Sequence, residues 1–315
     1  MDFSFNDDHL ALRDAVQRFC AGEYPAEQRG NALTPEQVQQ GRAAMAELGL
    51  LGLPFAFDVG GSEQGAVEVM LVAQELGCAL GDGAFVASTV MAGQLLTRLA
   101  SAEQQQHWLP GLASGQQQMA VAVYEAGARY DWQRTATRAL PSGTGWVLDG
   151  HKTQVLHGDT ADVLLVVART AGAHADRAGL SVFAVDATAP GVTVQGFDTL
   201  DNRRAAHVTF KNVQLGADRL VGQSGEAAEA VEAALDAATA ALCAEAVGAV
   251  DALLAHTAEH LRTRKQFGAP LAKFQVLQHR IVEMVIVTEQ ARSMAILAAS
   301  KEIGRASCRE RVSSP

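Results

Sequence analysis

Three patterns of apolar residues follow one another along this chain of 315 residues. Before about residue 118 and after about residue 222, apolar residues recur every three or four positions, which is typical of amphipathic helices. Between these regions, short apolar runs such as 163–167 and 180–185 are bounded by turn residues and predict buried strands. We therefore expect a helical domain at 1–118, a β domain at 119–222 and a second helical domain at 223–301.

Capping residues mark the helix starts in the first domain. Asp7 and Asp8 favour a helix N-terminus, where carboxylates interact well with exposed N–H groups. The segment from Thr34 to Gln37 combines a capping box with proline at the first helical position, and Ser101 begins a similar box. The run 66–80 is apolar over most of its surface, which predicts an interior helix.

The last domain has the pattern of a helical hairpin. Ser224 is a candidate cap for a helix to Arg264, which would be on the order of 60 Å long at about 1.5 Å per residue. Gly268 and Pro270 end that helix, and residues 271–300 predict a return helix. Two such helices make half of a four-helix bundle.

The β domain has short strands with no helical segments between them. Residues 207–210 alternate polar and apolar, as a half-exposed strand does. Short strands without intervening helices favour an antiparallel barrel or sandwich over a doubly wound sheet. The predicted fold class is therefore a multidomain α+β protein, with an N-terminal helical domain, a middle antiparallel β-barrel or sandwich, and half of a C-terminal helical bundle.

Composition excludes several classes of function. The net charge of −10 disfavours nucleic acid and anionic lipid as partners. No run of about 18 apolar residues is evident, which predicts no membrane span, and the acidic start resembles no signal or transit peptide. Four cysteines without short paired spacing argue against a disulfide framework or zinc site and indicate a reducing cytoplasm.

Metal and nucleotide motifs are missing from the sequence. His151 and His157 stand six residues apart, and a metal site would need two more ligands that the pattern does not present. No GxGxxG follows a strand and no P-loop occurs, so a nicotinamide or nucleoside-triphosphate site has no support.

The composition changes abruptly at residue 302. The string EIGRASCRERV within 302–315 resembles the translation of a short-read sequencing adapter. We therefore interpret 302–315 as an artefact, with a natural chain that continues further, over the alternative of a natural C-terminus.

The segment 262–284, RTRKQFGAPLAKFQVLQHRIVEM, closely resembles the helical-hairpin signature of the flavin-dependent acyl-CoA dehydrogenases. The strings AELGLLGLPFAFDVGGS, LDGHKT, ADVLLVVART and APGVTV are similar to other parts of that family, so the resemblance extends over residues 1–301. More narrowly, ARYD, VLHGD and CAEAVGA resemble the small subunit of pimeloyl-CoA dehydrogenase. The resemblance implies the same helical–β–helical order and FAD as cofactor.

The resemblance also implies a reaction. In the family a carboxylate removes the α-proton of an acyl-CoA while the flavin accepts the β-hydride. We expect desaturation of a medium-chain or dicarboxylic acyl-CoA, resembling pimeloyl-CoA, to the trans-2-enoyl-CoA, with an electron-transfer flavoprotein as acceptor. The alternative is a catalytically weak partner subunit that completes the flavin site of a large subunit, so the assembly is either a homo-oligomer or a hetero-oligomer.

The flavin-binding motifs of the β domain differ from the family pattern. Where the family usually has Thr-Glu-Pro-Gly-Ala-Gly-Ser-Asp, this chain has Tyr124, Glu125 and Gly127, followed by Arg129 and Tyr130 in place of the second glycine and serine. Arg129 would either replace the lost diphosphate contacts with its planar donors or be a solvated surface arginine. Tyr130 is interpreted as a half-buried tyrosine at a strand end.

A second flavin-binding motif of the β domain differs still more from the family pattern. Where the family usually has Trp-Ile-Thr-Asn against the flavin ring, this chain has Gln154 and Leu156 at the tryptophan and threonine positions. Leucine has no hydroxyl to donate, and glutamine is a poorer stacking surface than tryptophan. Both positions remain candidate cofactor contacts.

The hairpin keeps its family pattern. By resemblance, Arg264 and Gln266 reach the flavin diphosphate of a neighbouring subunit, while Phe267, Gln275 and Gln278 lie beside its adenosine part. Alternatively, Arg264 only caps the helix C-terminus, where the dipole favours a cation. That alternative explains Arg264 but not the other four residues.

No catalytic base is assigned from the sequence. In most of the family the base lies in the last helical region, which we expect in the missing C-terminal part. A minority place it on the long helix, where this chain has Ala238. Asp236 points about 160° away around that helix. Glu245 lies close to two turns further on and is interpreted as a buried or interface carboxylate.

Overall fold

The computed structural model describes residues 5–25, 27, 33–81 and 84–312, with side chains as far as 301. The chain forms two compact units. The helical unit comprises Met1–Arg29, Gly65–Gly81 and Thr239–Pro315, and the mixed unit comprises Gly30–Gln64 and Asp82–Ala238. Of the segment 302–315 that the sequence analysis interpreted as an artefact, residues 313–315 lie outside the described residues.

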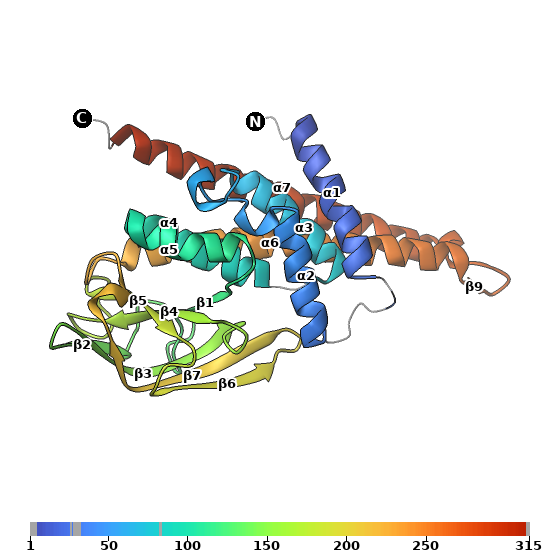
Figure 1. The fold of residues 1–315 in the computed structure, drawn as a ribbon. Coiled ribbons are helices and arrows are strands. Elements are labelled where there is room, and N and C mark those ends of the chain that lie inside the picture. Colours follow the sequence, from blue (N-terminus) through green and yellow to red (C-terminus); the bar gives the residue numbers. More distant parts are fainter. Residues whose placement is uncertain (1–4, 26, 28–32, 82–83, 313–315) are drawn as a thin grey trace. The chain divides into compact units, whose positions relative to one another are not determined.

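The helical unit is built from α1 (Asp7–Glu23), α3 (Ala66–Ala79), most of α6 (Ala228–Thr263) and α7 (Gln275–Val312) (Figure 1). Asn6 caps α1 in a reciprocal pair with His9, and Asp7 and Asp8 occupy its first turn, which confirms the predicted start. Most of α3 is buried, so the predicted interior helix is also confirmed.

Two glycines bring α3 and α6 into close contact. A Cβ at Gly77 would lie 2.0 Å from the carbonyl oxygen of Glu245, and a Cβ at Gly248 would lie 1.8 Å from that of Gln74. Real Cβ atoms do not approach backbone oxygens so closely, so only glycine fits at these two positions.

Gly248→Ala is therefore expected to lower the free energy of unfolding by about 1–3 kcal/mol, because α3 and α6 must separate to admit the methyl group. Urea unfolding followed by circular dichroism measures the loss. Gly22→Ala is the matched control, because Gly22 lies in α1 and a Cβ there would meet nothing within 4 Å, so this variant should be neutral or stabilising. Equal stability of the two variants would contradict this account of the helix contact.

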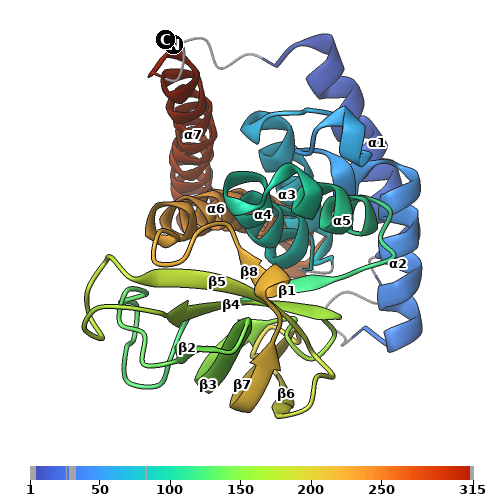
Figure 2. The ribbon, with the colours of Figure 1, turned by 60° about the vertical axis from the view of Figure 1, so that its left-hand side comes forward.

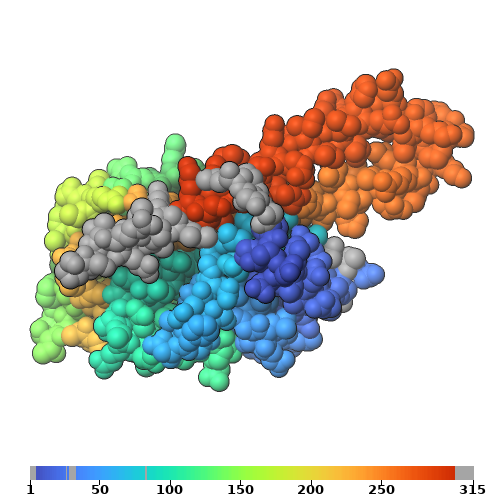
Figure 3. Space-filling view, turned by 90° about the horizontal axis from the view of Figure 1, so that it is seen from above, coloured from blue at the N-terminus to red at the C-terminus, as the bar shows by residue number. Residues whose placement is uncertain are grey.

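The α6–α7 hairpin closes through a tight turn. After Thr263, strands β9 (Lys265–Gln266) and β10 (Ala269–Pro270) pair around Phe267 and Gly268, whose φ angles are +53° and +77°. Positive φ at both central residues is the type I′ geometry that matches the twist of a hairpin. The turn η6 (Leu271–Lys273) leads into α7, which confirms the predicted return helix. Figure 3 shows the hairpin in orange and red.

The start of α6 differs from the prediction. The helix begins at Ala228, and the Ser224 hydroxyl donates a hydrogen bond to Thr170 at 3.1 Å instead of capping it. The backbone around Ser224 is held by β5, since Ala227 N–H donates to the Leu180 carbonyl at 2.9 Å. Tertiary hydrogen bonds thus delay the helix by about one turn.

Helix α6 bears on the membrane prediction. It is the one helix, among those described, that is long and apolar enough by composition to cross a membrane, with a mean hydropathy of 1.6 in its most apolar window. This hydropathy comes from many alanines, which lack the bulk of leucine or isoleucine. The glycine contact with α3 identifies it as a core helix of its unit.

The helices of the mixed unit follow the predicted caps. They are α2 (Pro35–Glu47), η2 (Leu50–Gly52), η3 (Phe57–Val59), the π-helical η4 (Phe85–Ala92), α4 (Gly93–Leu99) and α5 (Ala102–Ala113). Thr34 caps α2 and Ser101 caps α5, each in a reciprocal pair with a glutamine three residues later, as the capping boxes predicted.

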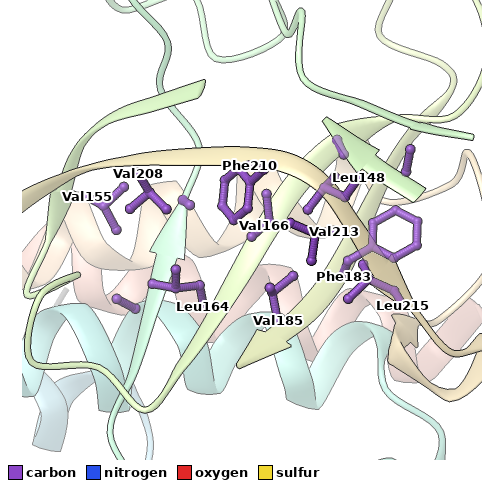
Figure 4. Packing of buried hydrophobic residues seen from close by; sticks show 14 of the residues in the cluster. Leu148, Val155, Leu164, Val166, Phe183, Val185, Val208, Phe210, Val213 and Leu215 are labelled. Atoms are coloured by element: carbon purple, nitrogen blue, oxygen red, sulfur yellow. The ribbon is translucent and has the colours of Figure 1, made fainter. Parts of the chain in front are cut away.

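The mixed unit holds one sheet in the order β6-β7-β3-β2-β4-β5-β8, with β1 paired to β4 (Figure 2). Its strands are β1 (Met119–Ala122), β2 (Arg138–Ser142), β3 (Gly145–Leu156), β4 (Val163–Arg169), β5 (Leu180–Asp186), β6 (Val192–Asp198), β7 (Arg204–Leu215) and β8 (Leu220–Val221). Apolar side chains such as Leu148, Val166, Phe183 and Phe210 form its buried core (Figure 4).

The predicted antiparallel barrel or sandwich is wrong in its closure and in part of its pairing. The described strands leave β6 and β8 at opposite ends of the sheet, so the sheet is open. β4 also pairs in parallel with β1 and with β2. Between β1 and β4 the chain passes through residues 123–137 and the antiparallel β2–β3 hairpin, so β4 again follows the direction of β1, and apolar runs alone do not reveal this pairing.

Candidate functional site

A long loop, residues 123–137, joins β1 to β2 and carries the first candidate motif. Its first part is tied to β3: Thr153 N–H donates to the Tyr124 carbonyl at 2.8 Å. Tyr124 itself is half-buried, and burial raises the pKa of its hydroxyl. The structure therefore brings the two candidate motifs of the β domain, around 124–130 and 154–156, next to each other.

Glu125 closes this loop through a buried ion pair with Lys152. The Lys152 ammonium, which is 0% exposed, donates to a Glu125 carboxylate oxygen at 2.8 Å and to the Val123 carbonyl at 2.9 Å. The Glu125 carboxylate also accepts from the N–H groups of Ala136 at 2.6 Å and Thr137 at 3.0 Å. Both carboxylate oxygens of Glu125 are therefore used within the protein.

The two charges shift each other's pKa. Burial lowers the pKa of Lys152 to about 8, although the attraction of Glu125 acts in the opposite direction. Burial alone would raise the pKa of Glu125, but Lys152 and the two backbone N–H groups outweigh it, so that pKa is lowered. The carboxyl group of Glu125 therefore stays ionised at neutral pH and acts as an acceptor.

The middle of the loop is an exposed turn. Gly127 and Arg129 have φ angles of +82° and +54°, the left-handed conformation in which successive N–H groups can form an anion-binding concavity. Within the described part of the chain, the N–H groups of Gly127, Arg129 and Tyr130 donate to no protein group. A Cβ on Gly127 would meet nothing within 4 Å, so glycine serves the backbone angle here and leaves the space above it open.

The side chains of Arg129 and Tyr130 in this turn point into solvent. Tyr130 is 93% exposed, so its interpretation as a half-buried strand-end residue is wrong. The cause is the turn itself, in which Ala128 is the buried residue. Arg129 is exposed and forms no ion pair with any described residue, which leaves its guanidinium available to a ligand or to water.

Gln154 and Leu156 share the exposed face of β3. Gln154 has a φ of +53° and lies in a bulge where the pairing of β3 with β7 shifts register between Lys152 and Val155. Leu156 is 40% exposed, and the alternate residue Val155 is buried in the core. The bulge sets both candidate side chains on the accessible side of the strand.

Arg169 is an organising residue that the sequence interpretation missed. It ends β4, is 2% exposed, and its guanidinium donates to six backbone carbonyls at 2.8–3.4 Å. Two of these carbonyls, of Gln133 and Thr135, belong to the loop 123–137. The signal in the sequence was a cation directly after the buried run 163–168, which is an unusual place for a charge.

The hairpin candidates lie in the helical unit, apart in sequence from the loop. All five candidate side chains are exposed: Arg264, Gln266, Phe267, Gln275 and Gln278. Phe267, 91% exposed, lies edge-on to Phe274 with ring centroids 6.1 Å apart, and Gln278 donates to the Ala272 carbonyl at 2.8 Å. The Arg264 side chain contacts no described charge, so both interpretations of it remain open.

The carboxylates of α6 do not supply an obvious base. Ala238 is buried and Asp236 is exposed, in agreement with their opposite directions on the helix. Glu245 is buried at 8% exposure, where its backbone packs on Gly77. Of the two candidate histidines, His151 on β3 is exposed and bonds to Thr209 at 3.0 Å, while His157 lies in the turn after β3 and is buried.

Comparisons with known proteins cover most of the chain. Models of the acyl-CoA dehydrogenase N-terminal, middle and C-terminal domains match residues 6–116, 120–213 and 228–313. The probable acyl-CoA dehydrogenase YngJ of Bacillus subtilis is 28% identical over 95% of this chain and 80% of its own length. FadE12 of Mycobacterium tuberculosis, an acyl-CoA dehydrogenase, is 29% identical over 95% of this chain and 78% of its own. Among solved structures, PigA with FAD and proline matches with a TM-score of 0.88, 25% identity, and coverage of 96% of this chain and 81% of its own.

Proposed function

Because this chain belongs to the acyl-CoA dehydrogenase family of FAD-dependent oxidoreductases, we propose that it desaturates an acyl-CoA to the trans-2-enoyl-CoA. The proposed substrate is a medium-chain or dicarboxylic acyl-CoA, on the narrower resemblance to pimeloyl-CoA dehydrogenase. The proposed electron acceptor is an electron-transfer flavoprotein. We place the reaction in a reducing cytoplasm, in keeping with the described cysteines Cys20, Cys78 and Cys243, which form no disulfide with one another.

The observation that carries this proposal is the direct link between the two flavin motifs, the hydrogen bond from Thr153 N–H to the Tyr124 carbonyl. It ties the loop that carries the open N–H groups of Gly127, Arg129 and Tyr130 to the strand that exposes Gln154 and Leu156. Donors in a left-handed turn suit a diphosphate, and a partly apolar strand face suits a flat ring, so these residues fit FAD. When bound, FAD supplies a two-electron acceptor for hydride.

The roles proposed for the protein groups follow from their chemistry. The backbone N–H groups of the turn hold the diphosphate, and the Arg129 guanidinium adds charge-assisted hydrogen bonds. Gln154 and Leu156 form the floor under the ring and exclude water from it. Among the carboxylates that the structure describes, none is assigned as the base that removes the α-proton.

A second candidate function is favoured by Leu156 and Tyr130. Leu156 provides no hydroxyl at a position where the family usually offers one, and Tyr130 places a large exposed ring where the family usually has serine. In this alternative the chain is a catalytically weak partner of a large subunit, and its hairpin residues complete the flavin site of that subunit. The exposure of all five hairpin candidates is compatible with such a contact.

Counting flavins separates the two functions. The full-length chain is purified alone and after co-expression with the product of its genomic neighbour, and FAD per chain is measured after denaturation. One FAD per chain, with flavin bleaching by acyl-CoA in the chain alone, supports the dehydrogenase. One FAD per pair of chains, with bleaching only in the complex, supports the partner subunit. A panel of mono- and dicarboxylic acyl-CoAs of graded length then identifies the substrate.

Arg264→Ala is expected to weaken FAD retention of the assembled oligomer about tenfold, the effect of losing one charge-assisted hydrogen bond. Dialysis followed by measurement of bound FAD tests this. Arg262→Ala is the matched control, since Arg262 is an exposed arginine two residues earlier that pairs with Glu259. FAD retention that is the same in both variants would leave Arg264 as a helix cap and remove it from the site.

A further inference from the structure

We propose that two buried cations, Lys152 and Arg169, are positioning residues that hold the loop 123–137 in its cofactor-binding conformation before any ligand arrives. This inference rests on the proposed function, because it assigns the loop to FAD. The loop has neither helix nor strand, and segments of this length without secondary structure need other interactions to fix them.

Lys152 holds the start of the loop and, through Glu125, its end. Its ammonium binds the Val123 carbonyl and the Glu125 carboxylate from a position with no solvent exposure. The same carboxylate receives the N–H groups of Ala136 and Thr137, so one side chain bridges the two ends of the loop. This closure resembles that of an Ω-loop, in which the ends of a compact surface loop lie close together.

Arg169 holds the second half of the loop. Its guanidinium binds the carbonyls of Gln133 at 3.0 Å and Thr135 at 3.3 Å. The same group binds the neighbouring loop 171–178, including the carbonyls of Asp176 at 2.8 Å and Ala178 at 3.0 Å. One planar side chain with several donors therefore fastens two loops to the end of β4.

Buried cations at positions 152 and 169 do something that apolar side chains could not do. A buried charge is often no more stabilising than a well-packed apolar side chain of similar volume, because its desolvation offsets its attractions. Apolar residues on β3 and β4 would therefore hold the sheet as well. They could not bind the carbonyls of an irregular loop, and this is the function that the cations add.

The part of the loop left between the two anchors is the part that faces a ligand. Residues 126–130 include the left-handed Gly127 and Arg129 and the open N–H groups. With both flanks fixed, these donors keep their directions without a ligand, so binding does not have to order them. Release of either anchor would leave a flexible loop with the same donors and weaker affinity.

The test uses a charge-neutral replacement of one anchor, Glu125→Gln/Lys152→Met. It leaves no unpaired buried charge, so the fold is expected to keep a thermal midpoint near that of the wild type. Arg169→Met is the second variant. The matched control is Asp186→Asn/Arg219→Met, which removes another ion pair of the mixed unit, with contacts of 2.9 and 3.0 Å that do not involve the loop.

Limited trypsin digestion of the FAD-free full-length proteins measures how accessible the loop 123–137 is to cleavage. Arg129 and Arg134 lie exposed inside the loop, and Lys265 in the hairpin is an exposed reference site. Cleavage after Arg129 and Arg134 is expected to be about tenfold faster in the anchor variants, as one or two lost hydrogen bonds imply, and unchanged at Lys265. The control double variant should be cut like the wild type.

FAD titration of the same proteins completes the test. The anchor variants are expected to bind FAD about tenfold more weakly while the control binds normally. Loop cleavage at the wild-type rate in Glu125→Gln/Lys152→Met would overturn the proposal, even if Arg169→Met fails to fold. A wild-type chain that binds no FAD, with faster cleavage in the variants, would count against the proposed function and leave the anchoring of the loop intact.

Discussion

Lys152→Met is expected to lower the free energy of unfolding by about 3–5 kcal/mol at neutral pH, because it leaves the Glu125 carboxylate buried without its cation. Methionine has a similar length and no charge, so the loss is electrostatic and leaves no large cavity. Urea unfolding followed by circular dichroism measures it. The single variant should therefore be less stable than the neutral double variant Glu125→Gln/Lys152→Met.

The loss should depend on pH in a defined direction. Burial is the largest influence on the pKa of Glu125, and it raises that pKa; the attraction of Lys152 is the next largest and lowers it. Without Lys152 the pKa of folded Glu125 therefore rises relative to the wild type. In mildly acidic buffer the carboxyl group of Glu125 in the variant becomes protonated, so no unpaired charge remains buried. The free energy of unfolding of the variant should therefore approach that of the wild type as pH falls, and the gap should widen as pH rises.

Lys211→Met is the control for this prediction. Lys211 is an exposed lysine on β7 of the same sheet, and its replacement should change the free energy of unfolding by no more than about 0.5 kcal/mol. If Lys152→Met costs as little as Lys211→Met, or if its cost grows toward acidic pH, the buried pair does not stabilise the fold.

The sequence predicted best those features that depend on neighbouring residues. The capping boxes at Thr34 and Ser101 were correct because a cap is formed by side chains within one helical turn. The buried strands 163–169 and 180–186 followed from their apolar runs. The hairpin turn at Phe267 and Gly268 was located by its glycine and proline, although its two short strands were not foreseen.

What the sequence could not show depends on distant contacts. The parallel pairing of β1 with β4 joins residues more than forty positions apart, as in Met119 with Val163, and leaves no local pattern. Ser224 has the chemistry of a helix cap but bonds instead to Thr170, which only the fold brings near. Lys152 and Arg169 are the clearest cases, because a cation on a strand gives no sign that its partners are carbonyls of a loop.

The sequence identified the motifs of the candidate site, but not the exposure or backbone conformation of their residues. Tyr124 and Gln154 belong to segments that the structure joins by a hydrogen bond between Tyr124 and Thr153. The exposure of Tyr130 depends on the left-handed turn before it, which requires φ values that a non-glycine residue such as Arg129 rarely adopts. From the sequence, Tyr130 was therefore expected at a strand end, whereas in the structure it lies in a turn.

Leu156→Thr is expected to raise the rate of flavin bleaching by acyl-CoA at least about tenfold, if this chain is the catalytic one. Threonine adds a hydroxyl donor on the accessible face of β3, and a donor there stabilises negative charge that develops beside it during hydride transfer. Leu156 is 40% exposed and threonine favours strands, so the substitution should not disturb the fold. Stopped-flow absorbance under anaerobic conditions measures the rate.

Leu156→Val is the control, because valine has the branched shape of threonine without its hydroxyl. A gain in the threonine variant alone assigns the effect to the hydroxyl and supports a flavin ring against β3. Equal rates for leucine, valine and threonine in the co-expressed complex, together with one FAD per pair of chains, would place the reacting flavin in the other subunit. The hairpin from Arg264 to Gln278 would then be the part of this chain that contacts it.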